Sequence, residues 1–284
     1  MEDKQLKIIY IVGSGYSGST ILGIILGSVK EIFNIGELKD FKDMQKFKDQ
    51  EICTCGNRLV DCNFWSSFMQ FDYNIFQPSI LKKLIYSLKV LIHGNFEVNA
   101  QKDDAYLLSL IFRKVKEFNP KVEYLLDNSK TLWRLIFLRN LNNVKTKVIY
   151  IKRGIEGNIS SYIKHKIGFW RGLFRYTMKN LLIQKYLKNN NVQFKEIDYL
   201  DFSKNTKKVI LELENYLDIS LSNYVQRIQN TTFHIASGNK GSRRQIIKKF
   251  KGIEYDNSWM TRLNRLEIFF LKIWRYLIRL FETN

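Results

Sequence analysis

Apolar residues occur along the chain in short continuous runs and in helical stripes that follow one another. Residues 8–12 form an apolar run typical of a buried strand, and residues 21–26 predict a buried helix directly after it. A second strand is expected at 32–35, a helical stretch at about 79–118, and further strands near 122, 148 and 193 with helices between them. This alternation predicts an α/β fold of three layers, with a central parallel sheet and helices on both faces.

The turn between the first predicted strand and helix is rich in glycine and hydroxyl side chains. It consists of Gly13, Ser14, Gly15, Tyr16, Ser17, Gly18, Ser19 and Thr20. Backbone N–H groups of such a turn and of the helix that it opens converge on one point, where the helix dipole is positive. The turn therefore predicts a binding site for a phosphate-like anion.

Three ligand classes use a turn of this kind. Gly13, Gly15 and Gly18 fit the G-x-G-x-x-G pattern of dinucleotide-binding folds, and Glu37 near the end of the second strand suits the same fold. The spacing also fits a nucleoside triphosphate loop, but Ser19 stands where the phosphate-binding lysine belongs, which disfavours an ordinary kinase or ATPase. An NAD(P)-binding Rossmann oxidoreductase stays open as an alternative, and it predicts no role for the arginine described next.

A second segment favours the third class. Residues 147–152 predict a buried strand, and they are followed by Arg153 and, eight positions on, by Ser161. This spacing resembles the R-x(7)-S motif that binds the 3′-phosphate in the sulfotransferase family, and the turn at 13–20 resembles that family's 5′-phosphosulfate loop, G-x-G-x-S-G-[ST]-[ST]. The resemblance implies a P-loop-like nucleoside-phosphate fold and the donor 3′-phosphoadenosine-5′-phosphosulfate (PAPS).

Three more segments are similar to bacterial sulfotransferases and occur in the family's order. They are C-T-C-G at 53–56 with D-C-N-F-W at 61–65, D-N-S-K at 127–130, and H-I-A-S-G-N-K at 234–240 followed by Arg243. The chain departs from the family at Tyr16, where arginine is common, and at residues 154–156, where the family often has Asp-Pro-Arg. Because a lost arginine removes a clamp on the phosphosulfate, we expect Lys130 to supply that charge.

The resemblance also implies a role for each site residue. The loop Gly15, Tyr16, Ser17, Gly18, Ser19 and Thr20 would hold the 5′ end of the donor, Arg153 and Ser161 the 3′-phosphate, and Asn239, Lys240 and Arg243 would close over the nucleotide. Lys130 would neutralise charge on the leaving oxygen, and Glu37 would be the general base.

Each of the two catalytic assignments has an alternative. Glu37 could instead be a first-turn acid of the next helix, Lys130 could be a surface lysine, and His165 is a weaker candidate for the base.

The charge of the chain points to anionic ligands. The formal net charge is +19, and residues 151–284 carry 25 Lys and Arg against 11 Asp and Glu. A polyanionic donor, an acidic glycan acceptor or an anionic membrane surface fits this charge. Nucleic acid is disfavoured as a partner because the sequence contains no recognised nucleic-acid-binding motif. An inactive sulfotransferase-like protein that binds membranes or polyanions is a further alternative, and the identity of the acceptor stays open.

A single domain is expected over residues 1–284. The sequence has only two prolines and no Gly/Ser-rich linker, so nothing in it indicates a domain boundary. An amphipathic helix near 258–281 could dock on the domain or lie in a membrane interface, and the absence of a signal-like N-terminus predicts a cytoplasmic protein.

An insert near 51–65 carries Cys53, Cys55 and Cys62. They could bind zinc or form one disulfide, but the local sequence offers no fourth ligand, although His93 or a distant residue could supply one. Buried reduced thiols without a metal are therefore the preferred interpretation.

Overall fold

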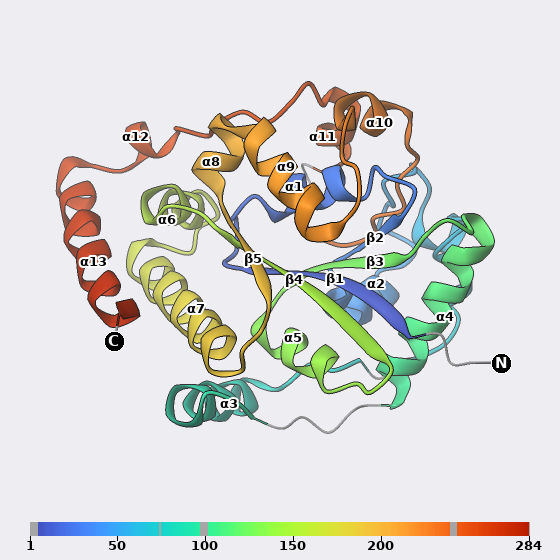
Figure 1. The fold of residues 1–284 in the computed structure, drawn as a ribbon, viewed down its shortest axis with the longest axis horizontal. Helices are drawn as coiled ribbons and strands as arrows, with labels where there is room; N and C mark the ends of the chain where they lie inside the picture. Colours follow the sequence, from blue (N-terminus) through green and yellow to red (C-terminus); the bar gives the residue numbers. More distant parts are fainter. Residues whose placement is uncertain (1–4, 74, 97–101, 239–242, 284) are drawn as a thin grey trace.

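The computed structural model describes residues 5–73, 75–96, 102–238 and 243–283 (Figure 1). Within these ranges, five strands form one parallel sheet in the order β2-β3-β1-β4-β5. The strands are β1 (Leu6–Gly13), β2 (Ile32–Gly36), β3 (Tyr124–Lys130), β4 (Val144–Lys152) and β5 (Phe194–Asp198). The predicted α/β fold with a central parallel sheet is confirmed.

The strand order bears on the choice between ligand classes. β1 lies between β3 and β4, so its two neighbours are both far away in the sequence. In the dinucleotide-binding and flavodoxin-like orders, β2 is a neighbour of β1. The sheet therefore differs from that of a Rossmann oxidoreductase, although the glycines of the first turn fit its pattern.

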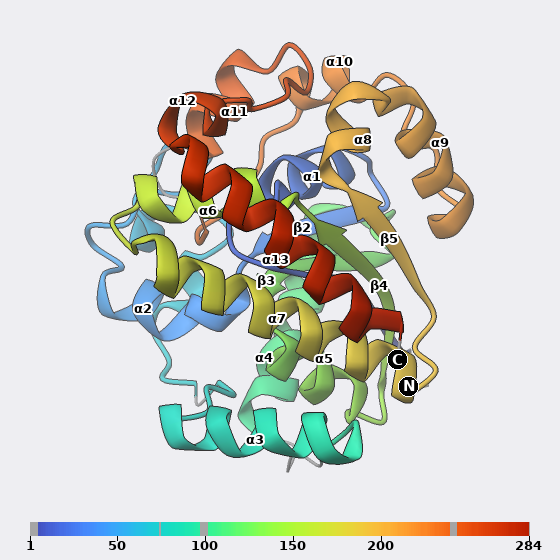
Figure 2. The same ribbon diagram turned by 90° about the vertical axis from the view of Figure 1, so that its left-hand side faces the viewer.

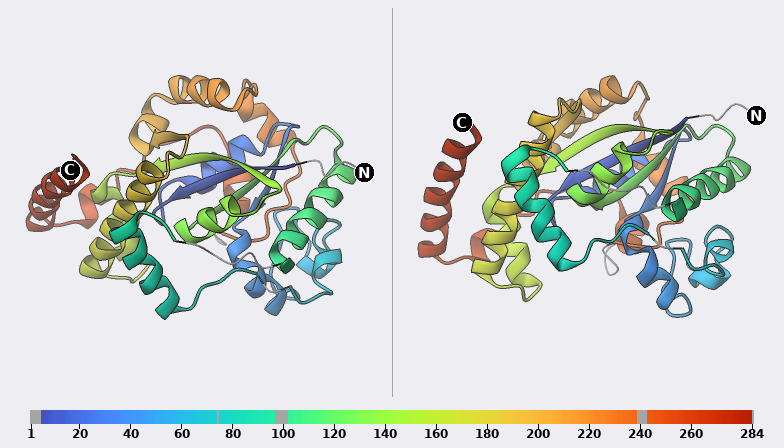
Figure 3. Two further views of the ribbon diagram at one scale, coloured as in Figure 1. Left: turned by 60° about the horizontal axis from the view of Figure 1, so that its bottom comes forward. Right: turned by 90° about the horizontal axis from the view of Figure 1, so that it is seen from below.

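Helices cover both faces of the sheet (Figure 1, Figure 3). The longer helices are α1 (Ser19–Leu26), α3 (Ile80–His93), α4 (Lys102–Phe118), α5 (Leu132–Arg139), α6 (Ile155–Lys164), α7 (Phe169–Asn189), α9 (Thr206–Leu217) and α13 (Arg265–Thr283). The shorter ones are α2 (Phe41–Lys46), α8 (Tyr199–Lys204), α10 (Tyr224–Asn230), α11 (Arg243–Lys249) and α12 (Trp259–Arg262).

Alternate side chains of β1 build the two halves of the core. Ile8 and Tyr10 pack with α4, α5 and α7 on one face, whereas Ile9 and Ile11 pack with α1 and α9 on the other. All four are fully buried, as expected for the central strand of a sheet that is covered on both sides.

The C-terminal amphipathic segment forms two helices rather than one. Asn264 separates them, because its side chain accepts a hydrogen bond from the backbone of Glu267 while Glu267 accepts one from the backbone of Asn264. This reciprocal capping starts α13. Figure 2 shows α13 (red) lying across α6 and α7, where Leu271 is fully buried and the Trp274 indole donates a hydrogen bond of 3.0 Å to the Thr177 hydroxyl.

The opposite side of α13 exposes Leu266, Phe269 and Tyr276, so contact with a membrane stays a prediction. In the part of the chain that the structure describes, none of the helices has the length and apolar character needed to cross a bilayer.

Candidate active site

A cavity of about 730 Å³ opens where β1, β2, β3 and β4 end. This is the edge at which parallel α/β sheets bind ligands. Nine of the residues predicted from the sequence line it. They are Gly15, Tyr16, Gly18, Ser19, Thr20, Glu37, Lys130, Arg153 and Ser161. The two segments predicted to bind anions, which are more than a hundred residues apart in the sequence, therefore face one space.

The first motif turns sharply from β1 into α1. Gly18 lies just before the helix with a φ of 93°, and a Cβ atom there would come within 2.6 Å of the Tyr199 ring. Among the described residues, no side chain caps the N-terminus of α1. Its first N–H groups are therefore available to an anion in the cavity.

Asn158 of α6 holds the turn in place. Its amide donates hydrogen bonds of 2.9 Å to the Ser14 hydroxyl and 2.8 Å to the Gly15 carbonyl. Ser17 is fully buried behind the turn and does not line the cavity, and its hydroxyl has no hydrogen-bond partner among the described residues.

Arg153 joins the two motifs. It follows β4, is only 8% exposed, and donates from one nitrogen to the Tyr16 carbonyl at 3.0 Å and to the Ser161 hydroxyl at 3.2 Å. Its guanidinium lies over the ring of Tyr199, 4.7 Å from the ring centre. The arginine is thus fixed between the turn and α6, with one polar face toward the cavity.

Asp256 neutralises part of this charge. Its carboxylate accepts a hydrogen bond of 2.9 Å from the second terminal nitrogen of Arg153. Burial acts to raise the pKa of Asp256, but hydrogen bonds from Ser258 and Arg153 outweigh it and lower the pKa to about 2. This residue could not be predicted from the sequence, since an aspartate in a loop after α11 carries no local signal.

Glu37 and Lys130 form an ion pair on the opposite wall. Glu37 is 7% exposed and contacts the ammonium groups of both Lys130 and Lys39, the latter at 2.7 Å. Burial acts to raise the pKa of Glu37, but the two ammonium groups hold it below its ordinary value. The backbone N–H of Glu37 donates to the Ser237 hydroxyl at 2.7 Å, which fixes the turn after β2.

Lys130 has a backbone conformation that lysine seldom adopts. Its φ is 62°, in the left-handed region, which costs a residue with a Cβ about 1 kcal/mol or more. Asp127 and Ser129, three positions and one position before it, hold the strand end through a hydrogen bond from the Ser129 hydroxyl to the Asp127 carboxylate. The conformation turns the lysine into the cavity.

A buried arginine also holds the end of β3 in place. Arg134 is 1% exposed and contacts Asp127 at 2.6 Å and Asp104 at 3.0 Å. Burial opposes its charge, but the two carboxylates raise its pKa above the ordinary arginine value. The ion pairs tie α4 and α5 to β3 directly beside Lys130.

The helix α7 adds two cations that the sequence analysis missed. Arg175 and Lys179 lie one turn apart and line the cavity. Burial, together with the nearby ammonium groups of Lys130 and Lys39, lowers the pKa of Lys179 to about 8. A basic pair at helical spacing is common on solvated helix faces, so nothing in the sequence distinguished this one.

The cavity is strongly positive as a whole. Six cationic side chains line it, against two carboxylates. The cations are Lys39, Lys130, Arg153, Lys164, Arg175 and Lys179, and the acids are Glu37 and Asp256. Such a lining concentrates anions.

Tyr16 takes the loop position at which the resemblance described from the sequence implies arginine. Its ring stacks on His165 at 4.4 Å, and both residues line the cavity. His165 therefore lines the candidate site and supports the ring of Tyr16. The neighbouring Lys164 also lines the cavity, and Lys130, the residue expected to replace the missing arginine, lines it too but is paired with Glu37.

Of the residues predicted to close over the nucleotide, Arg243 is placed away from the cavity. Arg243 is 2% exposed, donates to the backbone carbonyls of Ile52 and Gly238, and does not line the cavity. Asn239 and Lys240 lie outside the described residues.

No protein-family profile matches the sequence, and no curated protein matches it. Among solved structures, the chain is similar to a sulfotransferase domain from the curacin biosynthetic pathway, at 16% identity and a TM-score of 0.54, with 92% of each chain covered. A sulfotransferase domain from the olefin synthase of Synechococcus has 15% identity and a TM-score of 0.47, over 93% of this chain and 86% of that one. The first likeness extends over nearly the whole chain, so it concerns the full arrangement of sheet and helices and not the glycine turn alone.

Proposed function

We propose that this chain, which has the sulfotransferase fold, moves a sulfuryl group from PAPS to a hydroxyl or amine of an acceptor. One observation carries the proposal. Arg153 contacts the Tyr16 carbonyl of the first predicted anion motif and the Ser161 hydroxyl of the second, so the two motifs adjoin in one positive cavity. A donor with phosphate groups at its 3′ and 5′ ends requires such a pair of sites, whereas NAD does not require the second.

The donor would be held at both ends by groups already in position. The N-terminus of α1 and the hydroxyls of Ser19 and Thr20 would bind the 5′-phosphosulfate. Arg153 and Ser161 would bind the 3′-phosphate, which would replace the carboxylate of Asp256 on the guanidinium. Tyr199 beneath Arg153 would keep that arginine in place.

Sulfuryl transfer depends mainly on positioning and on stabilising charge, as phosphoryl transfer does. In this proposal the acceptor oxygen or nitrogen attacks sulfur in line with the departing phosphate oxygen of adenosine 3′,5′-bisphosphate. Lys130 offsets the negative charge that grows on that oxygen, and Glu37 accepts the proton of the acceptor. When Lys130 turns to the donor, Glu37 loses one of its two cationic partners, which raises its pKa and makes it a stronger base.

The cavity lining indicates the chemical class of the acceptor and not its identity. The cationic lining favours an acceptor that is itself acidic, such as an acidic glycan.

Calorimetric titration tests the donor site directly. Adenosine 3′,5′-bisphosphate should bind, and ATP and NAD should bind much more weakly or not at all. Arg153→Ala should weaken bisphosphate binding by about 1.5 to 3 kcal/mol, the usual effect of a lost charged hydrogen bond. Arg171→Ala is the matched control, because Arg171 is exposed on α7 and does not line the cavity.

The other outcomes separate the alternatives. Binding of NAD without the bisphosphate would support a dehydrogenase, against which the strand order argues. Binding of no nucleotide would support an inactive scaffold. If the bisphosphate binds, release of that product from PAPS should be abolished by Glu37→Gln, and activity that survives both Glu37→Gln and Lys130→Met would refute the catalytic assignment.

A further inference from the structure

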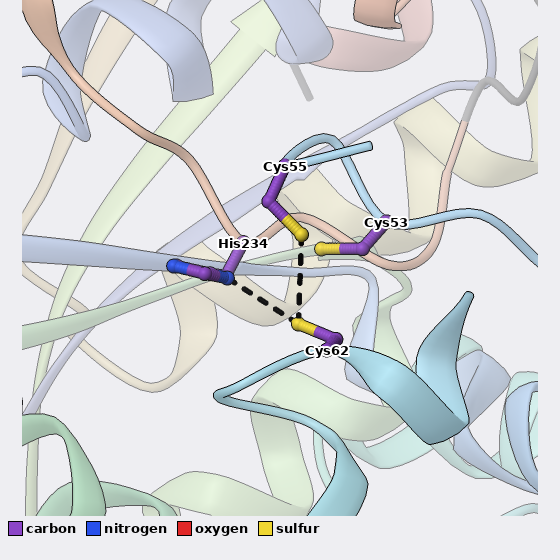
Figure 4. A group of neighbouring side chains, drawn as sticks. All are labelled: Cys53, Cys55, Cys62 and His234. Atoms are coloured by element: carbon purple, nitrogen blue, oxygen red, sulfur yellow. Dashed lines mark hydrogen bonds between the residues drawn. The ribbon is translucent and has the colours of Figure 1, made fainter. Parts of the chain in front are cut away.

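Three cysteines and one histidine meet outside the cavity. The sulfur atoms of Cys53, Cys55 and Cys62 and a ring nitrogen of His234 all lie within 4.8 Å of one another. Figure 4 shows the four side chains pointing toward a common centre, with the cysteines on the insert and the histidine on the chain that leads to residue 238. Cys53 and Cys62 are buried, and Cys55 and His234 are partly buried.

The spacing of the ligand atoms suits a tetrahedral metal. The sulfur atoms of Cys55 and Cys62 are 3.7 Å apart, and the Cys62 sulfur is 3.3 Å from Nδ1 of His234. In a tetrahedral zinc site with Zn–S of about 2.3 Å and Zn–N of about 2.0 Å, neighbouring ligand atoms are about 3.5 to 3.8 Å apart. The two separations lie within about 0.2 Å of these edges, and all four ligand atoms lie within 4.8 Å of one another.

Other hydrogen bonds join the cysteine-containing insert to residues 233–235. Thr54 accepts a hydrogen bond from the backbone of Ile235 at 2.8 Å and donates one to the Phe233 carbonyl at 2.7 Å. The indole of Trp65 donates to the His234 carbonyl at 2.6 Å. The histidine is therefore fixed from both sides along its chain, and its ring position does not depend on the sulfur atoms alone.

We propose that Cys53, Cys55, Cys62 and His234 bind one structural zinc ion. Three thiolates and one imidazole are a common structural zinc set, and four protein ligands leave no position open for a substrate. The sequence pattern favoured reduced thiols because no fourth ligand was local, and His234 is that ligand, 172 residues beyond Cys62. His93, the other candidate, does not belong to the cluster.

The zinc ion would connect the insert to the candidate active site. Three residues after His234, the hydroxyl of Ser237 accepts the backbone N–H of Glu37. A Cβ on Gly36 would come within 2.9 Å of that hydroxyl, so the two segments are closely packed. Fixing His234 therefore helps to fix the turn that presents Glu37.

Metal analysis of the untagged, purified chain tests the proposal. Elemental analysis should find one zinc ion per chain, and titration of the denatured protein should find three free thiols. Cys62→Ser and His234→Gln should each lose most of the zinc, whereas His93→Gln, an exposed histidine at the end of α3, should retain it.

Cobalt substitution of the wild-type chain covers the case in which the variants fail to fold. Co²⁺ added to zinc-free protein should give the strong visible bands of a tetrahedral site and a thiolate charge-transfer band, and zinc should displace it. The proposal fails if the chain refolded with excess zinc retains none after dialysis. It also fails if thiol titration finds one free thiol, which would indicate a disulfide, or if His234→Gln binds zinc as tightly as His93→Gln.

Discussion

The carboxylate of Asp256 lies 2.9 Å from the guanidinium of Arg153. Arg153 is the residue that is proposed to bind the 3′-phosphate of PAPS. The side chain of Asp256 is 46% exposed, and its other carboxylate oxygen accepts a hydrogen bond of 3.1 Å from the backbone N–H of Ser258. In the proposed mechanism, the carboxylate of Asp256 therefore competes with the 3′-phosphate for the same N–H group of Arg153.

Replacing that carboxylate should tighten donor binding. Asp256→Asn should lower the Kd for adenosine 3′,5′-bisphosphate roughly two- to fivefold in calorimetry, the range expected for a partly exposed ion pair. Glu254→Gln is the control, because it removes a neighbouring negative charge that is not paired with Arg153. Weaker binding by Asp256→Asn would instead mean that the carboxylate orients the arginine for its ligand.

Lys130 should affect rate more than donor affinity. Lys130→Met keeps much of the side-chain volume but removes the charge that is proposed to stabilise the leaving oxygen, so kcat should fall by about 10²- to 10³-fold. The measurement is the release of adenosine 3′,5′-bisphosphate from PAPS, with the Kd of the product determined in parallel. An unchanged rate together with a large loss of affinity would assign Lys130 to binding instead.

Lys179 should make stability depend on pH in the alkaline range. Its folded pKa of about 8 is below its ordinary value of 10.5, so between these values the unfolded chain binds more protons and stability rises with pH. Lys179→Met should be more stable than the parent at pH 7 by about 1 to 3 kcal/mol and should lack this rise. Urea unfolding at pH 7 and pH 9.5 measures both effects, and parallel pH curves for the two proteins would contradict the assignment.

Arg134 should be essential for stability. Arg134→Met leaves the fully buried carboxylates of Asp104 and Asp127 without their cation and should cost about 3 to 5 kcal/mol in the free energy of unfolding. Arg139→Met, on the exposed side of the same helix, removes only a hydrogen bond of 3.3 Å to the Tyr186 hydroxyl and a contact with its ring. It should change stability by no more than about 1 kcal/mol. Equal effects of the two substitutions would show that the buried ion pairs contribute little.

The parts of the site that the sequence predicted are those with a local signature. The apolar run at 8–12, the glycine turn and the Arg153 to Ser161 spacing each lie in one strand-to-helix junction, where short-range sterics and hydrogen bonding determine the conformation. Placing such junctions at one sheet edge follows from parallel pairing, and β1 and β4 are indeed paired along their length.

The residues that could not be predicted reach the site through tertiary packing. Asp256 and Lys179 come from a loop and a long helix whose positions depend on the packing of the whole domain. His234 meets the cysteines only because the insert and the chain around residue 235 are hydrogen-bonded, and that pairing has no signature in either segment. The break at Asn264 was predictable in principle, since asparagine followed three residues later by glutamate resembles a capping box.

The central place of β1 affects how the chain is made. β1 is completed at residue 13, yet its two partner strands begin at Tyr124 and Val144. At ordinary rates of translation the first of these partners follows on the order of ten seconds later. During that time the apolar residues of β1 lack both of the strands that cover their edges in the folded protein, so β1 is open to non-native pairing until residues 124–152 have been made.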